Sequence, residues 1–379
     1  MNKIRVMMIP SDPYGVGHYR NFWPAKMIQK NHSDEFQVDV RFREAITEDD
    51  LKNYDIIHYH RSIPAEDPLK IVNQFKNAGV ITVCDIDDYW VPPYGHPIRE
   101  LAIKKGLPKQ ITDNLKMADY VTTTTDIFKK RICALDKNIK VKVLPNGIDH
   151  NVEMWQLKRE PSDKVRIGWV GGSSHEKDLS KLHGTFNKLF SDKELEGKFQ
   201  IIMCGYDTRG TITEVGPDGK ERTRKIRPEE SIWNKFEAIF NNNGNHFKDG
   251  YVRRNTLPIN QYGKHYNYID VCLAPLVENI FNECKSELKL IETGMMKSAL
   301  IASDIHIYGE MLEHGKTGLL IPAKKDHKLW YKYIKELILN EELRTSLQNN
   351  LHDLVDPAYR LDVLTEDRCN WYKEILNGQ

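Results

Sequence analysis

The chain has 379 residues, which is enough for two domains of ordinary size. Hydrophobic residues make up 40% and charged residues 29%, and the formal net charge is +1, so no overall field favours nucleic acid as a partner. The six cysteines are scattered with no close pair, which fits reduced core residues better than a disulfide framework or a zinc site. The N-terminus has no signal-peptide pattern and no window holds eighteen apolar residues, so we expect a cytoplasmic protein.

Short apolar segments alternate with amphipathic helical segments through the first 150 residues. This alternation predicts a doubly wound parallel sheet, whose ligands bind at the carboxyl ends of the strands. His60 and Arg61 follow one predicted strand, and the acidic group of Asp85, Asp87 and Asp88 follows the next. The strands are expected over residues 4–9, 38–42, 54–60, 80–84 and 118–125 and from Val141, with helices over 21–30 and 68–78 among the connections.

The loop after the first predicted strand contains Gly15 and Gly17, just before a predicted helix. A glycine turn between a strand and a helix lets the backbone approach a bound anion, which the helix dipole favours. Two glycines are fewer than the dinucleotide-binding fingerprint requires, so an ordinary tight turn is the alternative. Arg20 follows this loop, where its charge would either support the anion or guide a second substrate.

The acidic run after the fourth predicted strand supports two interpretations. Asp85 and Asp87 stand two residues apart, a pattern that suits magnesium or manganese because these ions prefer carboxylate ligands. Without a metal, the same carboxylates would act on a substrate directly. His96 lies in the same loop and is either a second group of that site or an ordinary surface histidine.

The second half of the chain repeats the strand and helix alternation. A strand over residues 165–170 leads into Gly171, Gly172, Ser173, His175 and Lys177, again a glycine loop before a helix. Residues 208–228 alternate polar and apolar positions around 216–219, which predicts an inserted basic β-hairpin, either solvated or in contact with an acceptor or partner. The other expected elements are strands over 199–204, 250–254 and 271–275, and helices over 229–241, 257–267 and 361–376.

Residues 285–304 combine a helix with a buried strand. Leu288, Ile291 and Met295 fall at helical spacing with Ser286 at the N-cap position, and the apolar run 299–303 predicts a parallel strand. Lys289 and Glu292 are three residues apart on one side of this helix. A cation near a helix N-terminus suits a phosphate, and a carboxylate one turn further suits a ribose diol. A surface helix with a solvated ion pair is the alternative.

Residues 292–303 (ETGMMKSALIAS) resemble the E-A-M-A-C-G-T-P-V-I-A-S segment of retaining nucleotide-sugar glycosyltransferases of the GT-B fold, in the large bacterial group 1 type family. Residues 144–149 (LPNGID) resemble the segment before the interdomain linker of those enzymes. The motifs follow the family's order along most of the chain. The resemblance implies an α/β protein with two Rossmann-like domains facing a central cleft, with the hairpin inserted in the second.

The resemblance also implies domain boundaries. An acceptor-side domain is expected over residues 1–150, completed by a returning C-terminal helix over 356–379. Residues 151–164 are expected to form the linker, and residues 165–355 the domain that binds the nucleotide sugar.

Several residues take roles from the family. Glu292 matches the glutamate that holds the donor ribose, and Lys177 falls near the lysine that grips the diphosphate. The family's other glutamate lies eight residues before Glu292, where this chain has Cys284, so Glu283 and Glu287 are both open as substitutes. The expected donor-binding set is Gly15, Gly17, Arg20, Gly171, Gly172, Ser173, His175, Lys177, Arg253, Lys285, Ser286, Lys289 and Glu292, and the expected catalytic set is Asp85, Asp87, His96, Glu283 and Glu287.

We therefore expect a retaining glycosyltransferase that moves a hexosyl or related sugar from a nucleotide-diphosphate donor to an acceptor, with no metal and no other cofactor. The expected acceptor is a cell-surface glycan or a glycolipid, which adds peripheral association with the inner face of the membrane to the expectation. Alternatives are a sugar-nucleotide epimerase of the same fold and a non-catalytic nucleotide-sugar-binding protein. Glycosylation of DNA bases is a minor option, because the near-neutral charge disfavours DNA.

Overall fold

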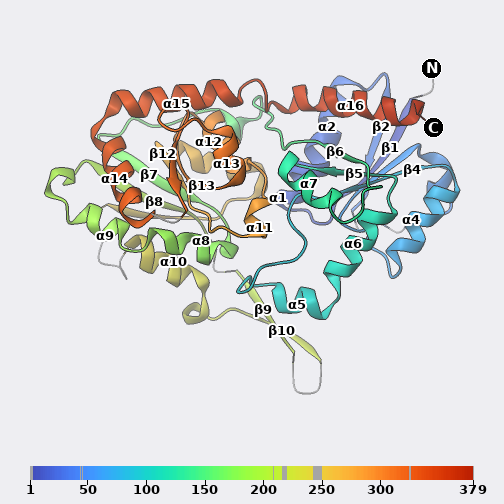
Figure 1. The fold of residues 1–379 in the computed structure, drawn as a ribbon, viewed down its shortest axis with the longest axis horizontal. Helices are drawn as coiled ribbons and strands as arrows, with labels where there is room; N and C mark the ends of the chain where they lie inside the picture. The colour runs from blue at the N-terminus through green and yellow to red at the C-terminus, as the bar shows by residue number, and fades with distance from the viewer. Residues whose placement is uncertain are drawn as a thin grey trace. The chain divides into compact units, whose positions relative to one another are not determined.

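The computed structural model describes residues 3–42, 44, 46–207, 209–215, 220–241, 250–323 and 326–378. The chain divides into two compact units, which Figure 1 shows as a ribbon. Unit 1 consists of Met1–Glu153, Glu278–Ile291 and Val355–Gln379, and unit 2 of Met154–Val277 and Glu292–Leu354. The bounds of these units differ from the expected domain boundaries in two segments. Residues 278–291 belong to unit 1, and residues 154–164 belong to unit 2, where Met154 and Trp155 are buried.

Unit 1 is built on a six-stranded parallel sheet with the order β2-β1-β3-β4-β5-β6. The predicted parallel sheet is thus confirmed, although β2 lies two residues earlier than expected. Phe36 and Val38 are buried beside β1, whereas Arg41 leaves the strand and pairs with Asp50. The strands are β1 (Ile4–Ile9), β2 (Phe36–Val40), β3 (Ile56–His60), β4 (Ile81–Asp85), β5 (Tyr120–Thr123) and β6 (Val141–Val143).

Helices cover both faces of this sheet. On one face, α2 and α16 bury their apolar side chains against β1, β3 and β4. On the other face, α4, α6 and α7 do the same. The helical elements are α1 (Gly15–Gly17), the π-helical turn η1 (His18–Phe22), α2 (Trp23–Asn31), α3 (Asp50–Asn53), α4 (Pro68–Asn77), α5 (Arg99–Lys104), α6 (Leu107–Met117), α7 (Asp126–Cys133), α11 (Ile280–Glu283) and α16 (Leu361–Asn377).

Unit 2 repeats the plan with a second six-stranded parallel sheet of order β11-β8-β7-β12-β13-β14. The predicted hairpin is confirmed as two antiparallel strands, β9 (Thr211–Val215) and β10 (Glu221–Lys225), while its predicted turn at 216–219 lies outside the described residues. The sheet strands are β7 (Val165–Val170), β8 (Phe199–Tyr206), β11 (Tyr251–Asn255), β12 (Val271–Ala274), β13 (Ala299–Asp304) and β14 (Leu319–Pro322).

A large apolar core joins this sheet to the helices on one of its faces, mainly α9, α10 and α14. The segment predicted as an α-helix over 257–267 is a 3-10 helix, η8. The helical elements are η2 (Glu153–Trp155), η3 (Ser173–His175), α8 (Glu176–Leu179), η4 (Ser180–Leu182), α9 (Thr185–Phe190), η5 (Lys193–Leu195), η6 (Pro228–Glu230), α10 (Ile232–Asn241), η8 (Ile259–Tyr268), α12 (Leu288–Met295), α13 (His306–Met311), α14 (Asp326–Leu339) and α15 (Glu341–Val355).

Candidate functional site

Each sheet has one point where neighbouring strands send their following loops to opposite faces. In unit 1 this point lies between β1 and β3, because the chain runs from β1 outward to β2 and from β3 outward to β4. In unit 2 it lies between β7 and β12 for the same reason. We call this point the switch point of the sheet. Open α/β sheets bind ligands outside the carboxyl ends of the strands at their switch points. Both predicted glycine loops follow these strands, Gly15–Gly17 after β1 and residues 171–172 after β7.

The loop after β1 is folded tightly around Asp12. The Oδ1 atom of Asp12 accepts hydrogen bonds from the backbone N–H groups of Tyr14 at 2.8 Å and Gly17 at 3.4 Å. A Cβ atom on Gly17 would lie 1.9 Å from the carbonyl oxygen of Asp12, so only glycine fits there. The chain then enters the π-helical turn η1, a rare conformation that often marks functional sites.

Arg20, in this turn, forms a buried bidentate salt bridge with Asp85 at the end of β4. The guanidinium donates from Nε at 2.9 Å and from Nη2 at 2.6 Å, while Nη1 donates to the Leu144 carbonyl and the Asn146 side chain. Burial opposes the charge on Asp85, but Arg20 outweighs it and holds the pKa of Asp85 well below its ordinary value. Both side chains are at most 1% exposed, so their charges are directed at each other.

The buried network continues from Asp85 to the C-terminal helix. Thr122 donates its hydroxyl to Asp85 at 2.6 Å, and the His58 Nε2 atom lies 2.9 Å from the same hydroxyl. The other ring nitrogen of His58 contacts the Tyr372 hydroxyl on α16. Burial, helped by the positive charge of Arg368, lowers the pKa of His58 to about 3, so this histidine is neutral at pH 7.

A second polar cluster at the same strand ends joins Ser11, His60, Arg61 and Asp87. The His60 ring lies 2.7 Å from the Ser11 hydroxyl through Nδ1 and 2.8 Å from Asp87 through Nε2. Arg61 also donates to Asp87 at 2.8 Å, from a backbone with φ of 61°, which is strained for a residue other than glycine. Burial opposes the charge on Asp87, but Arg61 and His60 outweigh it and hold its pKa well below the ordinary value.

The accessible part of this cluster is small. His60 is fully buried and Asp87 is 9% exposed, whereas Ser11 is exposed and the Arg61 side chain is 33% exposed. A ligand at the switch point of unit 1 would therefore contact the Ser11 hydroxyl and the Arg61 guanidinium before it contacted Asp85 or Asp87.

Residues 278–291 bring several predicted site residues into unit 1. The Ser286 hydroxyl accepts a hydrogen bond from the Asn146 side chain at 3.1 Å, so Ser286 joins the Arg20 network. Helix α12 begins at Leu288, one residue later than an N-cap at Ser286 implies, and the N–H groups of Leu290 and Ile291 donate to the Glu287 carbonyl. Lys285 lies 3.8 Å from Asp88 and 4.8 Å from the centre of the Phe281 ring.

Glu287 is the most unusual carboxyl group of this segment. It is 2% exposed, and its Oε2 atom is buried without a hydrogen-bond partner. Burial raises the pKa of Glu287 to about 7, although the charge of Arg20 and a hydrogen bond with Tyr359 each act to lower it. Such a carboxyl group changes protonation near neutral pH, which suits a group that acts on a bound substrate.

The two remaining catalytic candidates lie in different surroundings. Glu283 pairs with Arg131 at 2.5 Å, and the Glu283 side chain is 16% exposed. The His96 ring packs against Phe281, with 5.4 Å between ring centres. Unit 1 thus brings His96 and Lys285 to the same phenylalanine, while Glu283 is bound by an arginine.

In unit 2, Asp178 links the two loops at the switch point. The His175 Nδ1 atom lies 2.8 Å from Asp178, and the backbone N–H of Val277, after β12, donates to the same carboxylate at 2.9 Å. A Cβ atom on Gly171 would lie 2.3 Å from the Trp169 ring, so packing requires glycine there. Gly172 and Ser173 are exposed beside it, which leaves their backbone accessible to a ligand.

The other predicted donor-binding residues of unit 2 lie on α8, α12 and β11. Lys177 is exposed on α8, and Glu292 is 2% exposed on α12, where its carboxylate accepts a hydrogen bond from the Tyr266 hydroxyl at 2.7 Å. Arg253 lies on the edge strand β11 and binds Glu237 through two hydrogen bonds of 2.7 and 2.8 Å. Lys289, on the first turn of α12 and half-buried, belongs to the part of this helix that is in unit 1.

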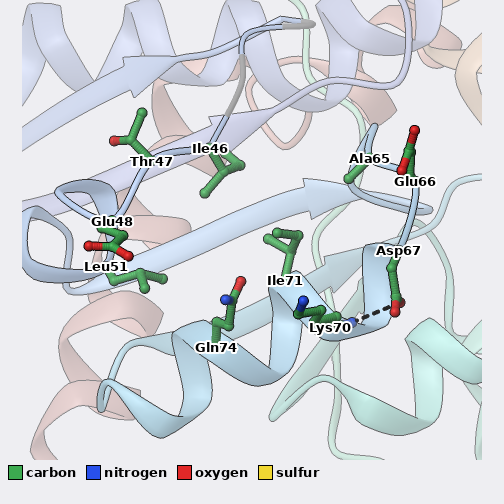
Figure 2. Close-up of a pocket in the computed structure, with 10 residues that line it drawn as sticks. All are labelled: Ile46, Thr47, Glu48, Leu51, Ala65, Glu66, Asp67, Lys70, Ile71 and Gln74. Carbon is green, nitrogen blue, oxygen red and sulfur yellow. Dashed lines mark hydrogen bonds between the residues drawn. The ribbon is translucent and has the colours of Figure 1, made fainter.

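A separate pocket of about 390 Å³ lies between α3 and α4 in unit 1 (Figure 2). Figure 2 shows Ile46, Leu51 and Ile71 turned toward one another, with Glu48 and Glu66 at its ends. The crossover from β2 to β3 carries only the four-residue helix α3, which leaves these side chains incompletely covered. The pocket shares no lining residue with the clusters above.

The described residues show neither a cluster of metal-binding side chains nor a helix suited to span a membrane. Within the described ranges, no three histidine, cysteine, aspartate or glutamate side chains gather as a metal site would require. Asp85 and Asp87, the candidate metal pair, are bound by Arg20 and by His60 with Arg61. None of the described helices combines the length and the apolar character that crossing a membrane requires.

Sequence reasoning placed His60 at a strand end without giving it a role, and it did not single out two other residues that the structure places at the switch points, Ser11 and Asp178. The position of His60 directly after a strand was a usable signal, because polar residues at strand ends gather at one edge of the sheet. Ser11 and Asp178 gave no such signal, since their partners are distant in the chain, at positions 60 and 277.

A scan against protein-family models and a search of curated protein sequences found no match. Solved structures do match. A glycosyltransferase from Rickettsia africae has 15% sequence identity and a TM-score of 0.65, with all of both chains covered. Sucrose-phosphate synthase from Thermosynechococcus elongatus has 13% identity and a TM-score of 0.69, also with full coverage. Anabaena HepE in complex with UDP has 11% identity and a TM-score of 0.65 over 98% of this chain and 100% of HepE.

At these identities the similarity concerns the fold. The parallel sheets of the two units, each with helices and a glycine loop at its switch point, correspond to the two Rossmann-like halves of these structures. This chain has the GT-B fold.

Proposed function

We propose that this protein is a glycosyltransferase that moves a sugar from a nucleotide-diphosphate donor to an acceptor, with retention of the anomeric configuration and without a metal. The observation that carries the proposal is the repeated arrangement of the strand ends: each sheet has a glycine loop at its switch point, beside a polar cluster. The donor class is supported by the fold neighbour HepE, whose structures contain UDP and UDP-glucose.

The donor is proposed to bind at the switch point of unit 2. The exposed backbone at Gly172 and Ser173, and the ammonium group of Lys177, would meet the diphosphate. Glu292 is proposed to accept hydrogen bonds from the ribose in place of the one it now accepts from Tyr266. Arg253 would lie near the nucleobase, and its pairing with Glu237 fixes its guanidinium plane.

The chemistry breaks the bond between the anomeric carbon and the diphosphate oxygen and forms a bond to an acceptor hydroxyl oxygen. The acceptor proton leaves with the diphosphate or passes to solvent. Positive charge develops on the sugar and negative charge on the diphosphate, so fixed cations and N–H groups lower the barrier. Lys177 and the loop N–H groups of unit 2 are proposed to fill that role without a metal.

Glu287 is our choice between the two glutamates that the sequence left open. Glu283 is bound to Arg131, whereas Glu287 has a buried oxygen without a partner and a pKa raised to about 7 by burial. A hydroxyl of a bound sugar would satisfy that oxygen. Arg20 and Asp85 are proposed to act by position, since their charges are paired with each other.

Incubation of the pure protein with a panel of nucleotide sugars tests the proposal. A transferase hydrolyses its preferred donor slowly when no acceptor is present, and release of nucleoside diphosphate by one member of the panel is the expected result. A donor that binds but is never cleaved would identify a binding protein, and conversion to an epimeric sugar nucleotide would identify an epimerase. The Glu287→Gln variant serves as the control, because it should retain binding and lose cleavage.

The acceptor is proposed to be a surface glycan or a lipid-linked glycan, with the protein in the cytoplasm at the inner face of the membrane. Ser11 and Arg61 are the accessible groups at the switch point of unit 1, and a hydroxyl with a guanidinium edge suits a sugar hydroxyl or a phosphate. Transfer of radiolabelled sugar to membrane lipid extracts, compared with transfer to soluble glycans, distinguishes the two acceptor classes.

A further inference from the structure

Exposed apolar side chains are concentrated in one short segment of unit 1. Nine large apolar residues are exposed on the described part of the chain, and four of them fall within residues 94–107. These four are Tyr94, at 78% exposure, Ile98 at 52%, Ile103 at 49% and Leu107 at 36%. Single exposed apolar residues are ordinary on protein surfaces, but a group confined to one segment marks an interaction surface.

The same segment carries a local excess of positive charge. Residues 94–109 contain four basic side chains, Arg99, Lys104, Lys105 and Lys109, and one acidic side chain, Glu100. The whole chain has a net charge of only +1, so this excess belongs to the segment and not to the protein in general. Lys104 and Lys105 are exposed, and the Lys109 side chain is 83% exposed and pairs with Asp113 at 2.6 Å.

The elements of the segment hold these side chains at the surface. Ala102 is the inward-facing residue of α5, with 4% exposure, while Ile103 and Lys104 follow it on the outer side. Leu107 and Lys109 occupy the first turn of α6. The Arg99 guanidinium lies 4.0 Å from the centre of the Tyr94 ring, which fixes the loop before α5. Figure 1 shows α5 and α6 as consecutive helices at the margin of unit 1.

This combination distinguishes between two anionic partners. Lysine and arginine bind both nucleic-acid phosphates and lipid headgroups, so the charges alone do not decide. Three aliphatic side chains gain nothing from a phosphate backbone, but each gains from entering the boundary between headgroups and acyl chains. Tyrosine is also enriched at that boundary, because its ring is apolar and its hydroxyl is polar. The observations therefore favour a lipid surface.

We propose that residues 94–109 form a membrane-docking surface, which inserts Tyr94, Ile98, Ile103 and Leu107 at the interface of an anionic bilayer while Lys104 and Lys105 bind the headgroups. The proposal rests on the membrane association in the proposed function and deepens it, with a lipid contact that requires neither donor nor catalysis. It identifies the partner as an anionic lipid surface and the attached part of the protein as unit 1.

Co-sedimentation of the full chain with vesicles tests the proposal. Vesicles of phosphatidylcholine with 30% phosphatidylglycerol should bind the protein at least about tenfold more tightly than vesicles of phosphatidylcholine alone, because a few basic residues near the surface attract anionic headgroups. Because salt screens this attraction, about 0.5 M salt should reduce the difference. Equal binding to both vesicle types, or binding to neither, would overturn the proposal.

Two matched pairs of variants separate this surface from general stickiness. Ile98→Ser with Ile103→Ser should lower vesicle affinity roughly tenfold or more, while Leu339→Ser with Val363→Ser, at exposed apolar positions elsewhere, should not. Lys104→Glu with Lys105→Glu should abolish the preference for anionic vesicles, whereas Lys26→Glu with Lys30→Glu on α2 should keep it. Thermal unfolding verifies that each variant is folded, and the lysine pair remains decisive if the serine pair fails to fold.

A nucleic-acid arm completes the test. A fluorescent 30-base-pair duplex should bind weakly, with an affinity that the serine pair leaves unchanged; tight duplex binding without vesicle binding would overturn the proposal. Donor hydrolysis in solution separates this result from the proposed function. The serine pair should leave that hydrolysis unchanged, so loss of docking and loss of catalysis are independent outcomes.

Discussion

The switch points of the two units have the same strand topology but are lined by different kinds of groups. In unit 1, the switch point is filled by polar and charged side chains that pair with each other, as in Arg20 with Asp85 and His60 with Asp87. In unit 2, the corresponding loops present exposed backbone at Gly172 and Ser173, and one carboxylate, Asp178, that ties the loops together. The side chains at the switch point of unit 1 already have hydrogen-bond partners within the protein. The loops of unit 2 leave backbone N–H groups for a ligand.

The difference indicates where binding energy is available. A buried ion pair that is already satisfied gains little from a ligand, because a ligand would have to replace its partner. Exposed N–H groups next to a helix start gain a full set of hydrogen bonds from an anion. We therefore expect substitutions in the unit 1 network to lower stability and substitutions in unit 2 to lower affinity.

The largest effect is expected from Arg20→Ala, which leaves the Asp85 carboxylate buried without its partner. We expect a loss of about 3–5 kcal/mol in the free energy of unfolding, measured by urea denaturation at pH 7. Arg131→Ala is the matched control, because it breaks the exposed pair with Glu283 and should cost about 1 kcal/mol or less. Equal losses in the two variants would contradict the view that the unit 1 network is structural.

Glu287→Gln should change the pH dependence of stability. Burial raises the pKa of Glu287 from 4.5 to about 7, so the folded state holds the proton more tightly than the unfolded state. The stability that this group contributes is complete below pH 4.5 and is lost as the pH rises through 7, in total roughly 3 kcal/mol. The glutamine variant should lack this loss between pH 5 and pH 8.

The measurement is urea denaturation of both proteins at the two pH values. Glu313→Gln is the control, since Glu313 is exposed beside Lys316 and its replacement should leave the pH dependence as in the wild type. If wild type and Glu287→Gln lose equal stability over this range, Glu287 is not a buried protonated group.

Glu292→Ala should weaken the binding of nucleoside diphosphate in unit 2. Loss of a charged acceptor for the ribose hydroxyls costs about 1.5–3 kcal/mol, or roughly 10- to 150-fold in Kd, by isothermal titration calorimetry. Tyr266→Phe, which removes the present hydrogen-bond donor to Glu292, should have a smaller effect on affinity. Unchanged affinity in Glu292→Ala would remove this residue from the donor site.

The smallest expected effect is that of chelation. Turnover should be the same with and without EDTA, because lysines and loop N–H groups are proposed to meet the diphosphate charge, and Asp85 and Asp87 already have cationic or histidine partners. Loss of turnover with EDTA and its recovery with manganese would show that the mechanism requires a metal.

The sequence predicted the strands better than it predicted the site. The bounds of β1 and β7 are as predicted, since each is a short, mostly apolar run with one arginine near its start and a polar or glycine loop after it. β14 was missed because Leu319–Pro322 is only four residues long and ends in proline. The helical period also indicated α12, but it did not indicate the contact between Ser286 and Asn146, which are 140 positions apart.

The site depends on contacts between residues far apart in the chain. Arg20 and Asp85 are 65 positions apart, and His58 and Tyr372 are 314 apart. Strand-end placement predicted that Asp85, Asp87 and His60 would lie near one another, because parallel strands share one edge. It did not predict which charges pair, since that depends on the register of the strands and on the π-helical turn that carries Arg20.

The chain crosses between the two units four times, at residues 153–154, 277–278, 291–292 and 354–355. Neither unit can therefore be expressed as one continuous fragment of the gene. A stop codon after Leu354 would leave β1 intact but remove Trp371 and Tyr372, which pack in one apolar cluster with Val6 and Met8. Strand β1 thus acquires part of its core from α16, which is translated later, and a nascent chain lacking that helix would expose this face to chaperones.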